Sequence, residues 1–207
     1  MIEIVGLPAT GKSHYCKASK FNCIRYHRGA LIKHAHVLVY SIMHPIYAAK
    51  LLYIIISSRQ NRIRDIRAVY VSFIVSIILQ KRALKSDEAI VLIDEGIIHA
   101  LYLIMFGAKN KDKLDDLIQN ELKNHPNKIV LFDLDPDIIL TNLINRHQYR
   151  LDKQIRKLND KAGRMNLLKQ EKAKYDRIIK FLNEDNILTL DVANLSSSKI
   201  DEALKKP

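Results

Sequence analysis

Short, mostly apolar runs separated by long helical stretches are the feature that most constrains how this chain can fold. Runs at residues 2–5, 89–93 and 128–132 carry apolar side chains that would point to both faces of each predicted strand, so both faces would be buried. Strands of this kind occur in parallel sheets that lie between two helical layers. Weaker runs at 22–27 and 187–192 extend the pattern. We therefore expect an α/β protein built on a parallel sheet.

The stretches between these runs predict helices, and the sequence gives no sign of a second domain. The 207 residues contain no Gly/Ser-rich or Pro-rich linker, no repeat and no low-complexity tract. A chain of this length can bury a sizeable core, so we expect residues 1–207 to form a single domain. A polar stretch at 149–163 separates the last two long helices. The predicted helices are 12–20, 30–57, 61–84, 97–106, 112–123, one that begins near Pro136, 164–182, and a short last helix capped by Ser196 to Ser198.

The first apolar run is followed by "GLPATGKS", residues 6–13. Gly6 and Gly11 allow a tight turn in which successive N–H groups point inward at phosphate oxygens. The helix that begins at Lys12 adds the positive end of its dipole, and the lysine itself adds a mobile charge. The Ser13 hydroxyl is suited to coordinate magnesium. The loop, with a strand before it and a helix after it, predicts a nucleoside triphosphate site formed by Gly6, Pro8, Ala9, Thr10, Gly11, Lys12, Ser13 and His14.

The run "VLIDEG" ends in two carboxylates, Asp94 and Glu95. Ligands bind at the carboxyl ends of strands in a parallel sheet, where the Gly6 loop and "DLDP" also fall. Asp94 would lie at the tip of its strand and reach magnesium directly or through water. The role of Glu95 stays open between two interpretations. In a kinase, one of the two carboxylates accepts the proton of an acceptor hydroxyl or binds substrate; in an ATPase, Glu95 orients the attacking water.

The net charge of +12 points to an anionic partner. Residues 146–180 hold twelve Lys or Arg against four Asp or Glu, a surplus of eight. Arg146 and Arg150 lie four positions apart, on one face if the helix continues, and are our candidates for neutralising a transferred phosphoryl group. The sequence shows neither a nucleic-acid motif nor aromatic residues interleaved with the basic ones. We therefore expect a small-molecule partner rather than nucleic acid.

The apolar stretch 37–58 approaches the length of a membrane span. His44, Pro45 and Lys50 near its middle argue against a lipid-exposed helix, so we expect buried core helices interrupted at Pro45. Contact with a membrane or an apolar substrate stays open as the less favoured alternative. Apolar helices between residues 37 and 79 could also form a homodimer surface. Cys16 and Cys23 have neither disulfide-framework nor zinc-site spacing, and no signal peptide is visible. These observations predict a cytoplasmic protein with reduced cysteines.

Taken together, these segments resemble P-loop kinases of the thymidylate kinase, nucleoside monophosphate kinase and deoxynucleoside kinase type. The resemblance rests on "GLPATGKS", "VLIDEG" and "VLFDLDPDIILTNLINRHQYR", and "ANLSSSKIDEAL" is similar to the end of such kinases. It implies a five-stranded parallel sheet, ATP with Mg²⁺, an acceptor-binding helical region at 30–84 and a helical lid at 146–164. By this resemblance, Lys12 contacts the terminal phosphates of ATP, and Ser13 and Asp94 bind the Mg²⁺ ion. Arg146 and Arg150 match the lid arginines.

The sequence also departs from that group. Thymidylate kinases usually follow the aspartate with arginine, and deoxynucleoside kinases carry Glu-Arg-Ser, whereas this chain reads Asp-Glu-Gly at 94–96. The 30–84 region is apolar and rich in Tyr and His, which fits an acceptor of apolar or sugar character. We expect a phosphotransferase that moves the γ-phosphoryl group of ATP to a nucleoside, a nucleoside monophosphate or another small molecule. A P-loop ATPase or nucleotide switch, and a polynucleotide kinase, stay open as alternatives.

Overall fold

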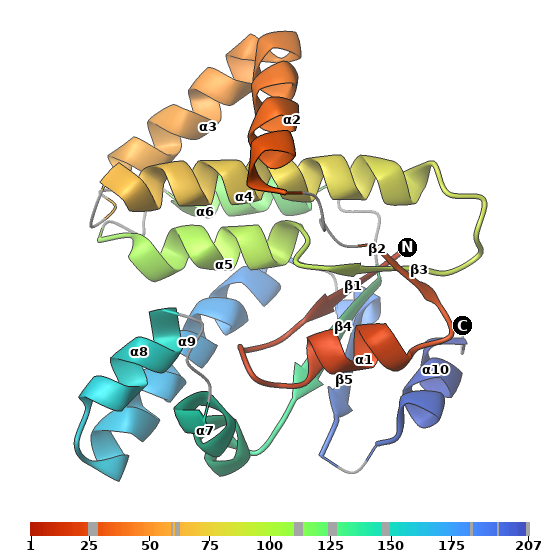
Figure 1. The fold of residues 1–207 in the computed structure, drawn as a ribbon, viewed down its shortest axis with the longest axis vertical. Coiled ribbons are helices and arrows are strands. Elements are labelled where there is room, and N and C mark those ends of the chain that lie inside the picture. Colours follow the sequence, from red (N-terminus) through yellow and green to blue (C-terminus); the bar gives the residue numbers. More distant parts are fainter. Residues whose placement is uncertain are drawn as a thin grey trace.

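A five-stranded parallel sheet forms the centre of the molecule, as the sequence predicts (Figure 1). The computed structural model describes residues 1–24, 29–58, 60, 63–109, 114–123, 128–145, 150–182, 184–193 and 195–205, without the side chains of residues 30, 64, 150 and 152. The strand order is β2-β3-β1-β4-β5, and each neighbouring pair is parallel. The strands are β1 (Ile2–Val5), β2 (Asn22–Ile24), β3 (Val91–Asp94), β4 (Lys128–Asp133) and β5 (Ile187–Asp191).

Helices cover both faces of this sheet. α4 and α5 lie on one side, and α1 and α10 lie on the other (Figure 1). α7, α8 and α9 gather beyond the carboxyl end of β4 (Figure 1). The described helices are α1 (Lys12–Ala18), α2 (Ala30–Met43), α3 (Pro45–Ser57), α4 (Ile63–Leu84), α5 (Ile97–Gly107), α6 (Asp115–Leu122), α7 (Pro136–Asn145), α8 (Arg150–Lys157), α9 (Lys161–Ile179), the 3-10 turn η2 (Glu184–Asn186) and α10 (Ser197–Lys205).

Alternation along the strands explains the two layers. Val5, Val91 and Ile93 belong to the core shared with α4 and α5, whereas Ile4 and Leu92 belong to the core shared with α1 and α10. Successive side chains of a strand point to opposite faces of the sheet. A strand that is apolar at every position therefore needs helices on both sides, which is the arrangement found here.

The polar stretch at 149–163 contains a helix, α8, where a helical lid was expected. The cause is an apolar pair, Leu151 and Ile155, whose side chains are 3% and 0% exposed in an otherwise charged sequence. Residues four apart lie on the same face of a helix, so two apolar positions are enough to dock a short helix on the core. Asp160 then caps α9 by accepting a hydrogen bond from the Gly163 N–H at 2.5 Å.

The break at Pro45 is present, because α2 ends at Met43 and α3 begins at the proline. The expectation that both helices are buried in the core was wrong for their outer faces, where Ile42 and Ile46 are 69% and 85% exposed. Among the residues described, no single helix is long and apolar enough to cross a membrane. The pair 31–43 and 45–57, bent by 113°, meets that criterion of length and composition only when the two are taken together.

Candidate functional site

The loop between β1 and α1 has the conformation that its glycines predict. Gly6 and Gly11 have φ of 149° and 90°, a region that favours glycine. A Cβ on Gly6 would lie 2.6 Å from the carbonyl oxygen of Phe132, so a larger residue cannot replace it without displacing β4. Ala9 also has a positive φ, 73°, and strain of this kind in a non-glycine residue is concentrated at functional sites.

The Lys12 ammonium group is enclosed by this loop. It donates hydrogen bonds to the carbonyl oxygens of Gly6 and Leu7, each at 2.8 Å. The Thr10 hydroxyl donates to the same Leu7 oxygen at 2.9 Å and closes the turn. The loop therefore surrounds a positive charge, which is the arrangement by which loops of this sequence bind nucleotide phosphates.

Ser13 and Asp94 meet where β1 and β3 end. The Ser13 hydroxyl donates a hydrogen bond to Asp94 Oδ2 at 3.2 Å, and Asp94 is buried at the tip of β3. A hydroxyl and a carboxylate are oxygen ligands that suit Mg²⁺, an ion that proteins bind through one or two such groups together with substrate phosphates. The described residues contain no cluster of three or more His, Cys, Asp or Glu that could hold a metal by themselves. This donor set thus fits magnesium that arrives with a nucleotide.

Glu95 and Gly96 turn the chain sharply between β3 and α5. Glu95 has a φ of 65° and is exposed, so its carboxylate is displayed beside Asp94. The buried Glu3 of β1 accepts a hydrogen bond from the Ile98 N–H at 2.8 Å and so caps α5. A Cβ on Gly96 would lie 2.6 Å from Glu3 Oε2, which explains the glycine. The sequence analysis missed Glu3, because its function depends on the pairing of β1 with β3.

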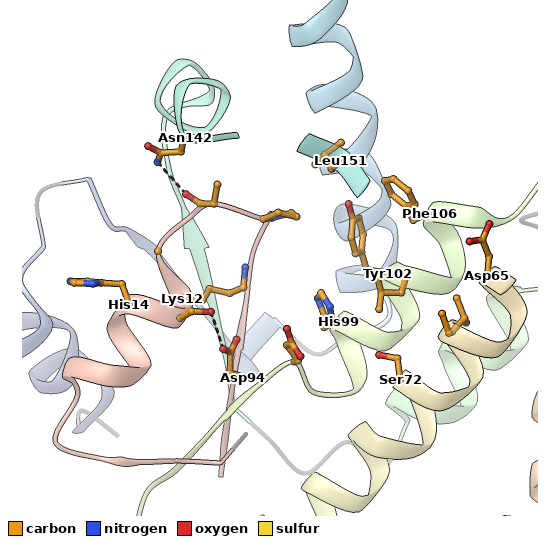
Figure 2. A pocket seen from close by; sticks show the side chains of 18 of the residues that line it. Lys12, His14, Asp65, Ser72, Asp94, His99, Tyr102, Phe106, Asn142 and Leu151 are labelled. Carbon is orange, nitrogen blue, oxygen red and sulfur yellow. Dashed lines mark hydrogen bonds between the residues drawn. The ribbon is translucent and has the colours of Figure 1, made fainter. Parts of the chain in front are cut away.

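A cleft of about 770 Å³ opens from the loop toward α4 and α5. Lys12 and Asp94 lie at one end (Figure 2). Ser13, which is hydrogen-bonded to Asp94, lines the cleft with them. Across from them, α5 contributes His99 and Tyr102 (Figure 2). The wall also has polar groups from Asp65 and Ser72 of α4, Asn142 and Asn145 of α7, and Glu95. Its apolar part includes Ala68, Val69, Leu103, Phe106 and Leu151.

The predicted acceptor region 30–84 contributes to this wall only through α4, among the residues described. α4 lines the cleft, but the lining contains no residue of α2 or α3 among those described. The Tyr and His residues that the sequence analysis singled out there are therefore not cleft residues. The aromatic and histidine groups in the cleft come from α5 instead, and the sequence analysis did not name them.

His99 lies in the wall of the cleft close to Lys12 and Asp94 (Figure 2). Its buried Nδ1 atom has no hydrogen-bond partner among the residues described. Burial, and then the positive charge of Lys12, lower the pKa of His99 from 6.5 to about 4. The imidazole is therefore neutral at pH 7 and keeps a polar atom for a ligand. Its one signal in the sequence is its place on α5, soon after Asp94 and Glu95.

Tyr102 joins the cleft wall to α9. Its hydroxyl donates to Glu171 at 3.0 Å, and its ring stacks on Tyr175 with centroids 4.2 Å apart. Lys174 pairs with the same buried Glu171 at 2.5 Å. Burial raises the pKa of both tyrosines well above the usual value, so both hydroxyls keep their protons. This network fixes the position of α9 against the cleft.

The two arginines predicted to clamp the phosphoryl group are not tested by the structure. Arg146 lies outside the described residues, and Arg150 opens α8 with a side chain that is not described. The next residue, Leu151, does line the cleft, so α8 borders it.

A smaller hollow of about 220 Å³ lies on the other side of the loop. Ala9, Gly11, His14 and Asn142 border both spaces, which makes the loop the partition between them. The Asn142 side chain of α7 donates to the Ala9 carbonyl oxygen at 3.2 Å and so supports the partition (Figure 2). The remaining walls come from α1, β4 and the segment after β5, with Phe132, Val192 and Ile200 among them.

We compared the chain with known protein families, curated proteins and solved structures. No protein-family model matches the chain, and a search of curated proteins gave no match. Among solved structures, the chain is similar to thymidylate kinase from Candida albicans, with a TM-score of 0.51 and 16% sequence identity. The similarity covers 98% of this chain and 88% of that enzyme. The chain therefore shares the overall fold of that enzyme, a five-stranded parallel sheet flanked by helices, as the sequence predicted.

Proposed function

We propose that this protein is an ATP-dependent phosphotransferase that moves the γ-phosphoryl group of ATP to a small molecule with an apolar body. The observation that carries the proposal is the 770 Å³ cleft, which begins at Lys12, Ser13 and Asp94 and continues between α4 and α5. Small-molecule sites have volumes of about 300–1,000 Å³, mainly apolar walls and a few convergent polar groups. A water nucleophile needs no such space.

The donor is assigned to the loop and the hollow behind it. Phosphates bound at Gly6–Ser13 would replace the loop carbonyls as partners of the Lys12 ammonium group. The smaller hollow, bordered by Phe132, Val192 and Ile200, is then left for the nucleoside of ATP. With the loop as partition, donor and acceptor occupy different spaces and meet only at the terminal phosphate.

On this proposal the side chains of the site neutralise phosphate charge, position the two substrates and exclude water from the reaction. Lys12 stabilises the negative charge that the terminal phosphate carries as it leaves its donor. Ser13 and Asp94 hold Mg²⁺, which neutralises charge on the phosphate oxygens when it is bound. The neutral His99 offers hydrogen bonds to the polar end of the acceptor, and Phe106 and Leu151 bind its apolar body. Arg146 and Arg150 remain the predicted clamp.

The transfer itself is a single displacement. An acceptor oxygen forms a bond to the γ-phosphorus while the bond to the oxygen that bridges the β- and γ-phosphorus breaks, which releases ADP. If the acceptor group is a hydroxyl, its proton passes to a base, and the exposed Glu95 carboxylate beside Asp94 is the nearest candidate on the strand end.

The same exposed Glu95 favours one second candidate, a P-loop ATPase. There Glu95 would orient a water molecule for attack, and the cleft would hold an effector or remain a structural groove.

An acceptor screen separates these two functions. ADP formation would be measured with ATP and Mg²⁺ alone and with a nucleoside, a nucleoside monophosphate, a sugar and an apolar alcohol. A kinase predicts that at least one acceptor raises the rate about tenfold or more, the scale of acceptor-dependent transition-state binding. A Lys12→Ala variant serves as the blank for contaminating kinases. A rate that no acceptor changes, with equal phosphate release, favours the ATPase.

A further inference from the structure

The outer sides of α2 and α3 carry apolar side chains that are exposed and do not pack in the core. We call it the hairpin face. Ile42 and Met43 are each 69% exposed just before the Pro45 bend, and Ile46 is 85% exposed just after it. Apolar side chains gathered on a protruding element mark a site of interaction. The hairpin face consists of Leu31, Ile32, Leu38, Val39, Ile42, Met43, Ile46, Leu52, Tyr53 and Ile56.

The inner sides of the same helices already pack against the hydrophobic core. Val37, Leu51 and Ile55 are buried in the core cluster that also contains residues of α4. α2 and α3 stand on α4 and extend away from the sheet, so their bend is the part farthest from it (Figure 1). A helix that is apolar on all sides is normally buried on all sides. In α2 and α3 only the inner side is covered, and the apolar outer side is exposed.

The charges around the hairpin face indicate the kind of partner. Residues 30–85 contain nine Lys or Arg and one acidic residue, Asp65, a surplus of eight, and two of these cations, Lys33 and Lys50, belong to α2 and α3. Residues 30–57 contain no Asp or Glu, and Lys50 of α3 is exposed. A second copy of the chain would add the same surplus of cations, and the acidic group described beside α3, Glu121, already accepts a hydrogen bond from Tyr47 at 2.8 Å. A bilayer with anionic lipids instead supplies negative charge to the cations and an acyl region to the apolar side chains.

We propose that the hairpin face docks on the surface of an anionic lipid bilayer. The bend of the hairpin enters the interface and neither helix crosses the bilayer, since α2 has 14 residues and α3 has 13. A helix of that length reaches about 21 Å, short of the ~30 Å hydrocarbon core. Tyr53, 67% exposed, is a residue type that favours the lipid–water boundary. The proposal takes up the membrane contact that the sequence left as the less favoured alternative.

The absence of tryptophan from the chain gives a direct test. Ile46→Trp places a single indole at the bend, and Leu84→Trp places one at the end of α4, outside the hairpin face. With phosphatidylglycerol vesicles, the emission of Ile46→Trp should shift to the blue and saturate with lipid, while that of Leu84→Trp stays unchanged. Phosphatidylcholine vesicles or high salt should reduce the effect, because the attraction is partly electrostatic.

Flotation of the protein with the same vesicles tests the apolar contribution to lipid binding. An Ile42→Asp, Ile46→Asp double variant should partition about a hundredfold more weakly, since each buried isoleucine favours the bilayer about tenfold or more. Leu84→Asp is the matched control and should float as the wild type does. Both variants change exposed positions, and circular dichroism would verify their fold. The proposal is overturned if phosphatidylglycerol vesicles leave Ile46→Trp emission unchanged. It is also overturned if the shift follows protein concentration with dimer formation and needs no lipid.

Discussion

The Ser13 hydroxyl donates a hydrogen bond to Asp94 Oδ2 at 3.2 Å, although 81 positions separate the two residues. The sheet makes this contact, because β1 and β3 are parallel neighbours with Ile4 opposite Asp94. The two groups that we assign to magnesium are therefore already adjacent. Preorganised ligands lose little conformational freedom when they bind, so this pair should control metal-dependent nucleotide binding.

Asp94→Asn should weaken ATP binding in the presence of Mg²⁺ by about 10- to 100-fold and leave metal-free binding nearly unchanged. Isothermal titration calorimetry with and without the metal measures both. Asp133→Asn is the control, since Asp133 ends β4 at the same edge of the sheet and lines neither hollow. Equal metal dependence in the Asp94→Asn variant and the wild type would remove Asp94 from the metal site.

Lys12→Ala should lower turnover by about 10²–10³ and weaken triphosphate binding, since the variant loses the charge that stabilises the transferred phosphate. Its melting temperature should change little. The matched control is Lys17→Ala, an exposed lysine of the same helix α1. Steady-state kinetics and thermal unfolding of both variants would measure the effects. Normal turnover in Lys12→Ala would exclude the loop from the mechanism.

His99 makes a pH-dependent contribution to stability. Its pKa falls from 6.5 to about 4 on folding, so the unfolded chain binds a proton that the folded protein does not. The free energy of unfolding should therefore fall as the pH drops from about 6.5 toward 4, by at most about 3 kcal/mol from this group. Urea unfolding of the wild type and His99→Gln measures it. The variant should lose less stability over this range, and identical curves would contradict the assignment.

The same variant probes the cleft. His99→Gln should raise the acceptor KM more than it lowers kcat if the imidazole binds the acceptor, whereas a loss of kcat alone would point to a role in the transfer step.

Gly96→Ala should destabilise the fold by about 2–3 kcal/mol, because the new Cβ meets the buried Glu3 carboxylate that caps α5. Gly29→Ala is the control, since a Cβ at Gly29 has no atom within 4 Å. Surface changes of that kind stay within about 0.5 kcal/mol. Urea unfolding compares the two. Equal stability of both variants would mean that Glu3 can move freely, against its proposed role in fixing the turn.

The strands and the phosphate loop could be predicted because their signals are local. An apolar run identifies a buried strand, and the spacing of Gly6, Gly11 and Lys12 is contained within a few residues. The actions of Glu3 and His99 are not local, since each depends on which elements pair or face each other in the sheet and cleft. The exposed side of α2 and α3 was missed for a similar reason. Composition shows that a helix is apolar but not which of its sides finds a partner.

The central claim, transfer of a phosphoryl group to a small acceptor, is tested most directly by following the γ-phosphate itself. ATP labelled in that phosphate would be incubated with the protein, Mg²⁺ and each acceptor of the screen, and the labelled products separated. We predict label in an acceptor in a one-to-one ratio with ADP, and none with Lys12→Ala. Label found in inorganic phosphate alone, whichever acceptor is present, would contradict the account.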